Sequence, residues 1–333
     1  DFVGSRGLGD VYKRQGSYGW ASAGRFHHAQ SQIHRFLNCI GGYTASVNTY
    51  SYAAAEVIVP HILGTFTGLL PRHTCWANIA DHCELFVAFG GLPLANGQMG
   101  NGGTGRHVQR EGFVAAVEAG VQFVNVSPRR LDMDSPATPE WLPIRPNSDT
   151  AMILALCHTL RAEGLADEEF LDSHCTGYEP FAAYLDGTVD GVPKDAFWAA
   201  ALTGIDADAI LGLARRMASC RTMISISWSL TRQQYGEQPY WAAISLAAML
   251  GQIGLPGGGF GFGYAIANHI GNNVRHVPFA ALPQGRNPVK GFIPVARISD
   301  MLLNPGAEFA YDGKSYTYPV SYTHLRAHET QRN

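Results

Sequence analysis

The stretch ELFVAFGG (residues 84–91) is a short apolar run that ends in two glycines. An apolar run of this length, bounded by turn residues, is typical of a buried strand. We therefore predict a strand over residues 84–89 that runs into a loop at Gly90 and Gly91.

Helices and strands alternate after this segment. The periodicity predicts them over residues 111–119 (helix), 121–126 (strand), 149–164 (helix), 207–218 (helix) and 221–227 (strand). Ser148 is the predicted N-cap of the helix that starts near Asp149. Strands that alternate with helices favour a parallel sheet with helices on both faces. The predicted fold class is therefore α/β, with a Rossmann-like nucleotide-binding domain.

Glycine-rich or polar loops follow all three predicted strands. They are Gly90-Gly91-Leu92-Pro93, Ser127-Pro128-Arg129-Arg130 and Ser227-Trp228-Ser229. Because ligands of parallel sheets bind at the carboxyl ends of the strands, this layout indicates a nucleotide site. The motif GNGGTG (residues 100–105) satisfies GxGxxG, but no strand directly precedes it, so a loop is favoured over a dinucleotide fingerprint there.

The sequence on either side of this region predicts part of a second α/β domain. A helix with Ile33, Phe36, Leu37 and Ile40 on one face is expected to end at Gly41. Both ends of the chain resemble translated adapter sequence. The predicted segments are a non-native tail (1–15), part of the second domain (16–80), the Rossmann-like domain (81–260), a return to the second domain (261–319) and another non-native tail (320–333).

The bulk composition excludes several classes of protein. The 333 residues are 46% hydrophobic and 15% charged, with a net charge of −3, so we expect a sizeable core and no basic surface for nucleic acid. No apolar stretch is long enough to span a bilayer, and residues 244–255 are expected to form a core helix that ends in a turn. The sequence contains no CxxC pair and no HExxH motif, which are signatures of zinc and iron–sulfur sites.

Several long motifs occur in a fixed order along the chain. They are GSYGW (16–20), SAGRFHHAQSQIHRFLN (22–38), GGYTASVNTYSYAAAEVIVPHILG (41–64), RPNSDTAMILALCHTL (145–160), SWSLTRQQYGEQ (227–238) and MLGQIGLPGGGFGFGYAIANHIG (249–271). In these motifs the chain resembles the dimethyl sulfoxide reductase family of molybdopterin enzymes, from Gly16 to about Pro319. The segments FHHAQSQIHRFLN (26–38) and LNPGAEFAYDGKSYTYP (303–319) are most similar to the family's biotin sulfoxide reductase branch.

The resemblance implies that Ser51 is a protein ligand of molybdenum. In the family, a serine that follows a tyrosine binds the metal through its side-chain oxygen, and Ser51 follows Tyr50. An alkoxide oxygen is a hard donor that suits high-valent molybdenum, while the dithiolenes of the pterins supply soft sulfur ligands. On local sequence alone, Ser51 would instead be a serine that starts a helix.

Further site residues are implied by the same resemblance. Tyr18 would hydrogen-bond the substrate oxygen as the S–O or N–O bond breaks. Trp20 and Trp228 would pack around the metal and its pterins, and Arg232 would line the substrate funnel. Ser51, Tyr18 and Trp20 are thus the expected catalytic residues.

The implied cofactor is molybdenum with two molybdopterin guanine dinucleotides. The guanosine and diphosphate end of one dinucleotide would occupy the predicted sheet site. The residues expected to contact it are Gly90, Gly91, Leu92 and Pro93 near the diphosphate, Ser127, Pro128 and Arg130 near the ribose or guanine, Asp149 as an acceptor for guanine, and Ser229 and Gln233.

The resemblance implies a two-electron reductase of small-molecule sulfoxides or N-oxides, such as biotin sulfoxide, methionine sulfoxide, trimethylamine N-oxide or dimethyl sulfoxide. It also implies a monomeric protein and favours a cytoplasmic over a periplasmic location, but it does not indicate the electron donor. Polypeptides of the family are more than twice as long. We therefore expect the chain to be an internal part of a longer enzyme and to be inactive by itself.

Some alternatives remain open at the level of sequence. Ala21 and Ala53 stand where family members often carry lysine and glycine, which leaves the substrate branch open. A nicotinamide-dependent dehydrogenase would use the same sheet, but it would need a fingerprint after the first strand and a ribose-binding acid, which the sequence does not show. A nucleotide-binding module without catalysis is the other alternative.

Overall fold

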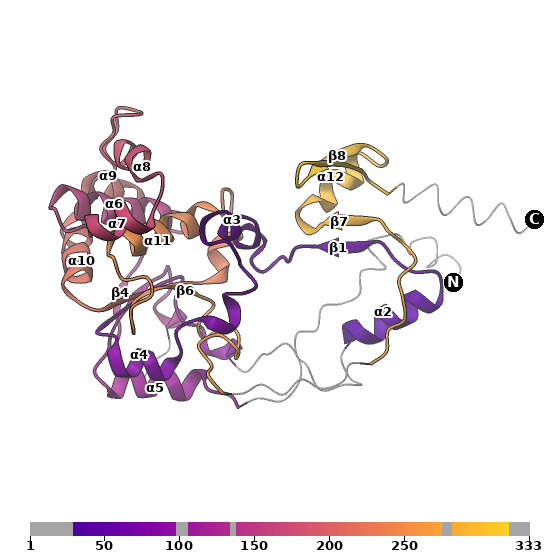
Figure 1. Cartoon of the computed structure of the whole chain (residues 1–333), viewed down its shortest axis with the longest axis horizontal. Coiled ribbons are helices and arrows are strands. Elements are labelled where there is room, and N and C mark those ends of the chain that lie inside the picture. The colour runs from indigo at the N-terminus through magenta and orange to yellow at the C-terminus, as the bar shows by residue number, and fades with distance from the viewer. Residues whose placement is uncertain (1–28, 98–105, 134–137, 275–281, 320–333) are drawn as a thin grey trace, which may run out of the picture. The chain divides into compact units, whose positions relative to one another are not determined.

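The computed structural model of the chain describes residues 29–97, 106–133, 138–274 and 282–319. The chain forms two compact units (Figure 1). The larger unit consists of residues 51–100 and 105–276, and the smaller unit of residues 1–50, 101–104 and 277–333. Each unit has a hydrophobic core of its own.

The larger unit is built on five parallel strands in the order β4-β3-β2-β5-β6. Their bounds are β2 Leu85–Phe89, β3 Gln122–Val126, β4 Glu140–Leu142, β5 Thr222–Ile226 and β6 Gly259–Phe262. The three strands predicted from the sequence are β2, β3 and β5, and each lies within one residue of its expected bounds. The strands β4 and β6 have only three and four residues, too few for a clear sequence pattern.

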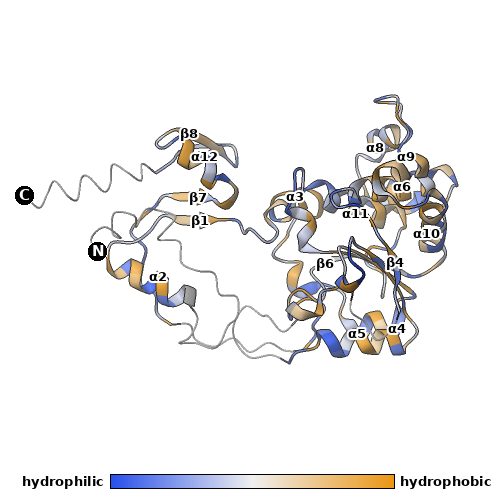
Figure 2. Cartoon of the chain, turned by 180° about the vertical axis from the view of Figure 1, so that it is seen from behind, coloured by the Kyte–Doolittle hydropathy of each residue, from blue (hydrophilic) through white to orange (hydrophobic). Residues whose placement is uncertain are grey.

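Helices lie on both sides of this sheet (Figure 1), and Figure 2 shows the same layers from behind. One side carries α4 (Trp76–His82) and α5 (Gln109–Glu118). The other side carries α6 (Asp149–Ala162), α7 (Glu168–His174), α8 (Tyr178–Leu185), α9 (Ala196–Thr203), α10 (Ala207–Ser219) and α11 (Gln238–Met249), and α3 (Ala53–Leu63) packs on α11. The predicted α/β class, a parallel sheet flanked by helices, is confirmed.

The core of the larger unit centres on β2 and β5. Every side chain of these two strands is buried. Phe86 of β2 packs against Trp76 of α4, with 5.9 Å between the ring centroids. On the opposite side, Met152 and Leu156 of α6 are 0% exposed. Burial of one such side chain contributes roughly 1.5–3 kcal/mol, so each of these residues stabilises the unit appreciably.

Two local predictions differ from the structure. Ser148 occupies the N-cap position of α6, but its hydroxyl donates to the carbonyl of Arg145 at 2.6 Å and caps no helical N–H. The core helix expected over residues 244–255 is α11, which begins earlier because Pro239 suits the first turn of a helix. Gly251, with a φ of +65°, then turns the chain after the helix.

The compact units differ from the predicted domain segments. The predicted boundaries lie at 80/81 and 260/261, whereas the units change at 50/51 and 276/277. Residues 51–80 join the sheet because α3 packs on α11 and Trp76 packs on β2. Periodicity reports local structure, so it does not show to which core a helix belongs.

The smaller unit contains α2 (Ala29–Cys39), α12 (Ile298–Leu303) and two two-stranded sheets. In the first sheet β1 (Ala45–Val47) and β7 (Phe292–Pro294) are parallel, and in the second β8 (Glu308–Tyr311) and β9 (Lys314–Thr317) are antiparallel. Its core comprises Ile293, Met301, Phe309 and Tyr318. This mixture of helix and strand matches the α/β composition expected of the second domain.

The expected apolar face of α2 is only partly buried among the residues that the structure describes. Leu37 is 6% exposed, but Phe36 and Ile40 are 56% and 53% exposed. Gly41 follows the end of the helix with a φ of +114°, as predicted. Helical spacing identifies an apolar stripe, but burial also requires an element that packs against it.

Within the described ranges, no single helix is long and apolar enough to cross a membrane. The helices α9 and α10 reach the required length and composition only as a pair, which is bent by 119°. Both belong to the larger unit and lie on the same side of its sheet as α6 (Figure 1).

Candidate functional site

The strand order of the larger unit reverses between β2 and β5. After β2 the chain adds β3 and β4 on one side, and it then returns to add β5 and β6 on the other side. In open α/β sheets, ligands bind at such a switch point, beyond the carboxyl ends of the strands. The loops after β2 and β5 therefore border the candidate site.

Backbone hydrogen bonds hold the loops after four strands at this edge of the sheet. The first residue after each strand donates its N–H to a carbonyl of the neighbouring strand. The bonds are Gly90 N to Val126 O (2.8 Å), Ser127 N to Leu142 O (3.3 Å), Ser227 N to Phe89 O (2.8 Å) and Gly263 N to Ile226 O (3.1 Å). The sheet therefore fixes where each loop begins.

Two glycines let the loop after β2 pass close to its neighbours. Gly90 and Gly91 have φ values of +82° and +77°, which L side chains rarely adopt. A Cβ on Gly90 would lie 2.6 Å from Cβ of Ser227 and 2.5 Å from Cδ1 of Leu230. A Cβ on Gly91 would overlap the backbone of Asp132. Packing of the loops themselves thus requires glycine at both positions.

Leu92 and Pro93 complete the loop after β2. Leu92 is 0% exposed, and its N–H donates to the carbonyl of Asp132 at 2.7 Å. Pro93 is half-buried and precedes the short 3-10 turn Leu94–Asn96. Leu92 therefore belongs to the core, and its side chain is not available to a ligand.

The loop after β3 is held by its own polar groups. The buried Ser127 hydroxyl lies 2.5 Å from Oδ2 of Asp132, in the 3-10 turn Arg130–Asp132. The indole N–H of Trp141 donates to the Ser127 carbonyl at 2.9 Å. Of the residues predicted near the ribose or guanine, Ser127 is thus bonded within the protein, whereas Pro128 and Arg130 are exposed.

Asp149 is a buried carboxylate in the first turn of α6. It is 6% exposed, and burial raises its pKa to about 6, although a hydrogen bond from its own backbone N–H opposes this. No side chain of the described residues donates to it. Because α6 follows β4, its first turn lies at the carboxyl edge of the sheet. An acceptor held out of water suits a ligand with two N–H donors, as guanine has.

Trp228 places a hydrogen-bond donor at the same edge. Its side chain, in the 3-10 turn Trp228–Thr231, is 7% exposed, and its Nε1 has no partner among the described residues. Gly263 faces this nitrogen, because a Cβ there would lie 2.5 Å from it. An unsatisfied buried donor costs about 1–3 kcal/mol. A bound ligand that offers an acceptor at this point would remove that cost.

The other predicted residues after β5 lie nearer the surface. Ser229 is exposed, and its hydroxyl donates to Oγ of Ser227 at 2.9 Å. Arg232 is exposed and Gln233 is half-buried. These two side chains are therefore accessible from solvent, as a funnel residue and a ligand contact would need to be.

The segment Ser51-Tyr52 lies against the loop after β5. The Ser51 carbonyl accepts a hydrogen bond from Oγ1 of Thr231 at 3.3 Å. The buried ring of Tyr52 packs edge-on against Trp228, with 4.4 Å between centroids. Burial raises the pKa of Tyr52 to about 12, so it is a neutral phenol at physiological pH. The structure thus brings together the predicted metal ligand Ser51 and the predicted cofactor residue Trp228.

Tyr18, Trp20 and the GxGxxG motif at 100–105 were predicted from the sequence but lie outside the described residues. Conversely, Tyr52, Asp132 and Gly263 border the site in the structure but were not predicted from the sequence. Tyr52 directly follows Ser51, which is a usable signal. The other two approach the site only through tertiary packing.

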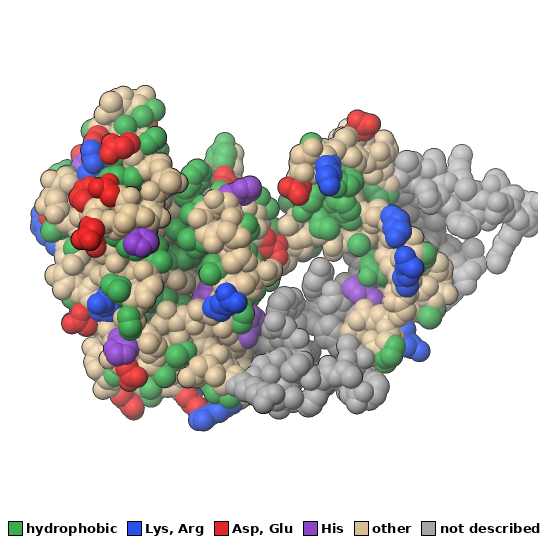
Figure 3. Space-filling view, viewed as in Figure 1, with side chains coloured by type: hydrophobic (Ala, Val, Ile, Leu, Met, Phe, Trp, Pro, Cys, Tyr) green, Lys and Arg blue, Asp and Glu red, His purple; other side chains and the backbone are tan. Residues whose placement is uncertain are grey.

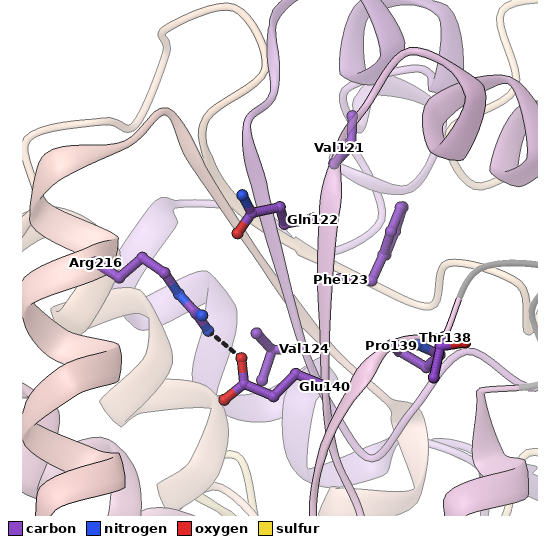
Figure 4. Close-up of a pocket in the computed structure, with 8 residues that line it drawn as sticks. All are labelled: Val121, Gln122, Phe123, Val124, Thr138, Pro139, Glu140 and Arg216. Atoms are coloured by element: carbon purple, nitrogen blue, oxygen red, sulfur yellow. Dashed lines mark hydrogen bonds and ion pairs between the residues drawn. The ribbon is translucent and has the colours of Figure 1, made fainter.

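A cavity of about 240 Å³ lies at the opposite edge of the sheet, near the amino ends of β3 and β4 (Figure 4). Its lining consists of Val121, Gln122, Phe123, Val124, Thr138, Pro139, Glu140 and Arg216. Arg216 of α10 donates to the Glu140 carboxylate at 2.6 Å. None of the predicted site residues lines this cavity.

The sequence pattern of the molybdopterin oxidoreductase family matches residues 8–315. The chain belongs to this family. Its relatives include biotin sulfoxide reductase from Cereibacter sphaeroides (45% identity over 304 residues), dimethyl sulfoxide/trimethylamine N-oxide reductase from the same organism (38% over 314 residues) and trimethylamine-N-oxide reductase from Haemophilus influenzae (36% over 317 residues). Each alignment covers 91% of the chain but only 41%, 38% and 38% of the respective relative. The chain thus spans about two fifths of the length of these relatives.

Membership of the molybdopterin oxidoreductase family confirms the resemblance and implies molybdenum with molybdopterin as the cofactor. It also argues against the alternative that the chain is a nicotinamide-dependent dehydrogenase. Three observations fit a nucleotide-bearing cofactor along the carboxyl edge of the sheet. They are the buried acceptor Asp149, the indole N–H of Trp228, which has no partner among the described residues, and the closely packed loop at Gly90.

Proposed function

We propose that the chain forms part of the molybdenum site of a reductase that removes oxygen from sulfoxides or N-oxides, with two molybdopterin guanine dinucleotides on the metal. The packing of Ser51-Tyr52 against the loop of Trp228, at the switch point of the sheet, carries this proposal. The Ser51 hydroxyl and the Trp228 indole N–H, which has no partner in the part of the chain that the structure describes, lie near the edge at which a nucleotide would bind. The names of the three relatives support the same reaction class.

The residues of the chain would hold and orient the reactants. When bound, the molybdenum and its dithiolene sulfurs supply the two-electron chemistry in which the substrate oxygen leaves, with two protons, as water. Ser51 offers a hard oxygen ligand, and Trp228 offers an N–H to an acceptor of the pterin. Arg232 would attract the polar oxide. Tyr18 and Trp20 keep the roles that the resemblance implies.

The guanosine end would lie along the carboxyl edge of the sheet. The Asp149 carboxylate would accept hydrogen bonds from N1–H and the amino group of guanine. The backbone at Gly90 and Gly91 would approach the diphosphate. Pro128 and Arg130, both exposed, would lie beside the ribose or the base.

Biotin sulfoxide and methionine sulfoxide are the first substrates to test, followed by trimethylamine N-oxide and dimethyl sulfoxide. Biotin sulfoxide comes first because biotin sulfoxide reductase is the most similar of the three relatives. On the same likeness we extend the proposal to a monomeric protein in the cytoplasm rather than the periplasm.

In the decisive experiment, this chain replaces the matching segment of the Cereibacter sphaeroides biotin sulfoxide reductase. The hybrid enzyme is produced in a host supplied with molybdate. We expect the hybrid enzyme to bind molybdenum and pterin and to reduce at least one of the four oxides. Ser51→Ala should abolish oxide reduction while the circular dichroism spectrum stays unchanged. Ser245→Ala, which alters another half-buried serine of the larger unit, should leave the activity intact.

Two results would overturn the proposal. One is a hybrid enzyme that binds molybdenum and pterin but reduces none of the four oxides. The other is a Ser51→Ala variant that is as active as the Ser245→Ala variant.

A further inference from the structure

The helix α9 exposes an apolar face. Its sequence, AFWAAALT, contains no charged residue. Ala196 and Ala199 are buried, and the helix packs on α6. On the outward face, however, Phe197 is 72% exposed and Leu202 is 45% exposed. Helices without a polar face are normally buried. This exposed face, however, has no partner within the described part of the unit.

The loop before α9 adds apolar groups and is firmly held. Val189 and Val192 are 67% and 43% exposed. Lys194 is only 2% exposed, and its Nζ donates to both carboxylate oxygens of Asp190, at 2.9 Å and 2.8 Å. The same Nζ lies 4.2 Å from the centroid of the Tyr184 ring. The valines are thus presented on a loop whose shape is set by the ion pair between the buried Lys194 and the exposed Asp190. We name Val189, Val192, Phe197 and Leu202 the α9 patch.

The chain segment that contains the α9 patch is strongly acidic, and the exposed Arg145, which donates to the carbonyls of Ala201 and Leu202, is a cation beside the C-terminal end of α9. Residues 163–208 contain eleven of the 27 acidic residues of the chain but only one of its 24 basic residues, the buried Lys194. Asp186 and Glu163 form salt bridges with arginines, but Glu168 and Glu179 form none with the described residues. Figure 3 shows Asp and Glu side chains gathered over this part of the larger unit, around α7 and α8.

We propose that the α9 patch is a docking surface for a partner protein whose apolar contact area is surrounded by lysine and arginine. Burial of the four apolar side chains would supply affinity, and the acidic surroundings would select and orient a basic partner. The same charges would repel an anionic lipid surface, although α9 and α10 together are apolar enough to suggest one. None of the residues of the α9 patch belongs to the proposed molybdenum site, so the two proposals stand or fall separately.

The test uses the whole chain and a fluorescent amphipathic peptide of leucine and lysine as the probe. A peptide with glutamate in place of each lysine serves as the charge-reversed probe, and binding is followed by fluorescence anisotropy. We expect the lysine peptide to bind, more weakly as salt increases, and the glutamate peptide not to bind. Phe197→Asp should weaken binding about thirtyfold, or about 2 kcal/mol. Val189→Asp, on the loop, should also weaken it.

The matched control is Leu131→Asp, because Leu131 is also 72% exposed but lies after β3. It should leave peptide binding unchanged, and circular dichroism checks that each variant folds. Equal binding of both peptides, or equal binding of the lysine peptide by Phe197→Asp and Leu131→Asp, would refute the proposal. Two further results would replace it with another occupant. These are self-association or binding to vesicles of anionic lipid, each lost in Phe197→Asp.

Discussion

Replacement of Gly90 by alanine tests whether the close approach of the loops after β2 and β5 shapes the site. The new Cβ would lie 2.6 Å from Cβ of Ser227 and 2.5 Å from Cδ1 of Leu230. The leucine methyl can rotate away, but Cβ of Ser227 is attached to backbone that is hydrogen-bonded to β2. The clash must therefore move one loop away from the other.

The expected loss has two parts. A residue other than glycine in the left-handed region costs roughly 1–2 kcal/mol. An extra methyl group forced into packed structure costs about 1–3 kcal/mol. We therefore expect Gly90→Ala to lower the free energy of unfolding by about 2–5 kcal/mol.

The matched control for this variant is Gly177→Ala. Gly177 has the same φ, +82°, but a Cβ there would meet nothing within 4 Å. This variant should therefore show only the backbone strain, about 1–2 kcal/mol. The difference between the two variants measures the steric contact between the loops.

Urea unfolding followed by tryptophan fluorescence measures both losses, since five of the six tryptophans lie in the larger unit. With a slope of roughly 1–3 kcal/mol per molar urea, the midpoint of Gly90→Ala should fall by about 0.7 M or more. Coincident midpoints for Gly90→Ala and Gly177→Ala would show that the loops do not constrain each other.

Three further predictions use the same unfolding assay. Burial raises the pKa of Asp149 from 3.8 to about 6, so ionisation of its carboxyl group between these values costs stability. Asp149→Asn should therefore stabilise the chain by up to about 3 kcal/mol above about pH 7 and by little below about pH 4. An equal gain at both pH values would contradict this cause. Desolvation of its imidazole lowers the pKa of the half-buried His73 from 6.5 to about 4, so up to about 3 kcal/mol should be lost as the pH falls through that range. His73→Phe should flatten this acid limb, and an unchanged limb would assign it to other groups. Trp228→Phe removes an indole N–H that has no partner among the described residues, and this gain offsets part of the packing lost with the larger ring, so the free energy of unfolding should fall by no more than about 2 kcal/mol; a loss above about 4 kcal/mol would mean that the nitrogen is bonded in the protein.

Much of the larger unit can be predicted from short stretches of sequence. A strand buried on both faces needs a continuous apolar run, and β2 and β5 are such runs. The chain must then turn, so glycine or serine follows at Gly90, Ser127 and Ser227. Both requirements act within a few residues, and local patterns therefore predict these strands and their exit loops.

Details of the site could not be predicted in this way. Ser127 and Leu92 follow the strands as expected, but both form hydrogen bonds with Asp132, which lies in the loop after β3, and not with a ligand. Ser148 has the residue type of an N-cap, yet its hydroxyl bonds the preceding turn. Hydrogen-bonding side chains take the nearest suitable partner, and tertiary packing decides which partner that is.

The sequence by itself determined the alternation of strands and helices, the loops at the strand ends and, through its long motifs, the family. Only the tertiary structure decided that Ser51-Tyr52 packs against the loop of Trp228, that Asp149 is buried without a side-chain donor among the described residues, and that α9 exposes Phe197. The physical reason is the distance along the chain over which each kind of interaction acts. Periodicity and turn chemistry act between near neighbours in the chain, whereas contact and burial depend on elements that meet only after folding.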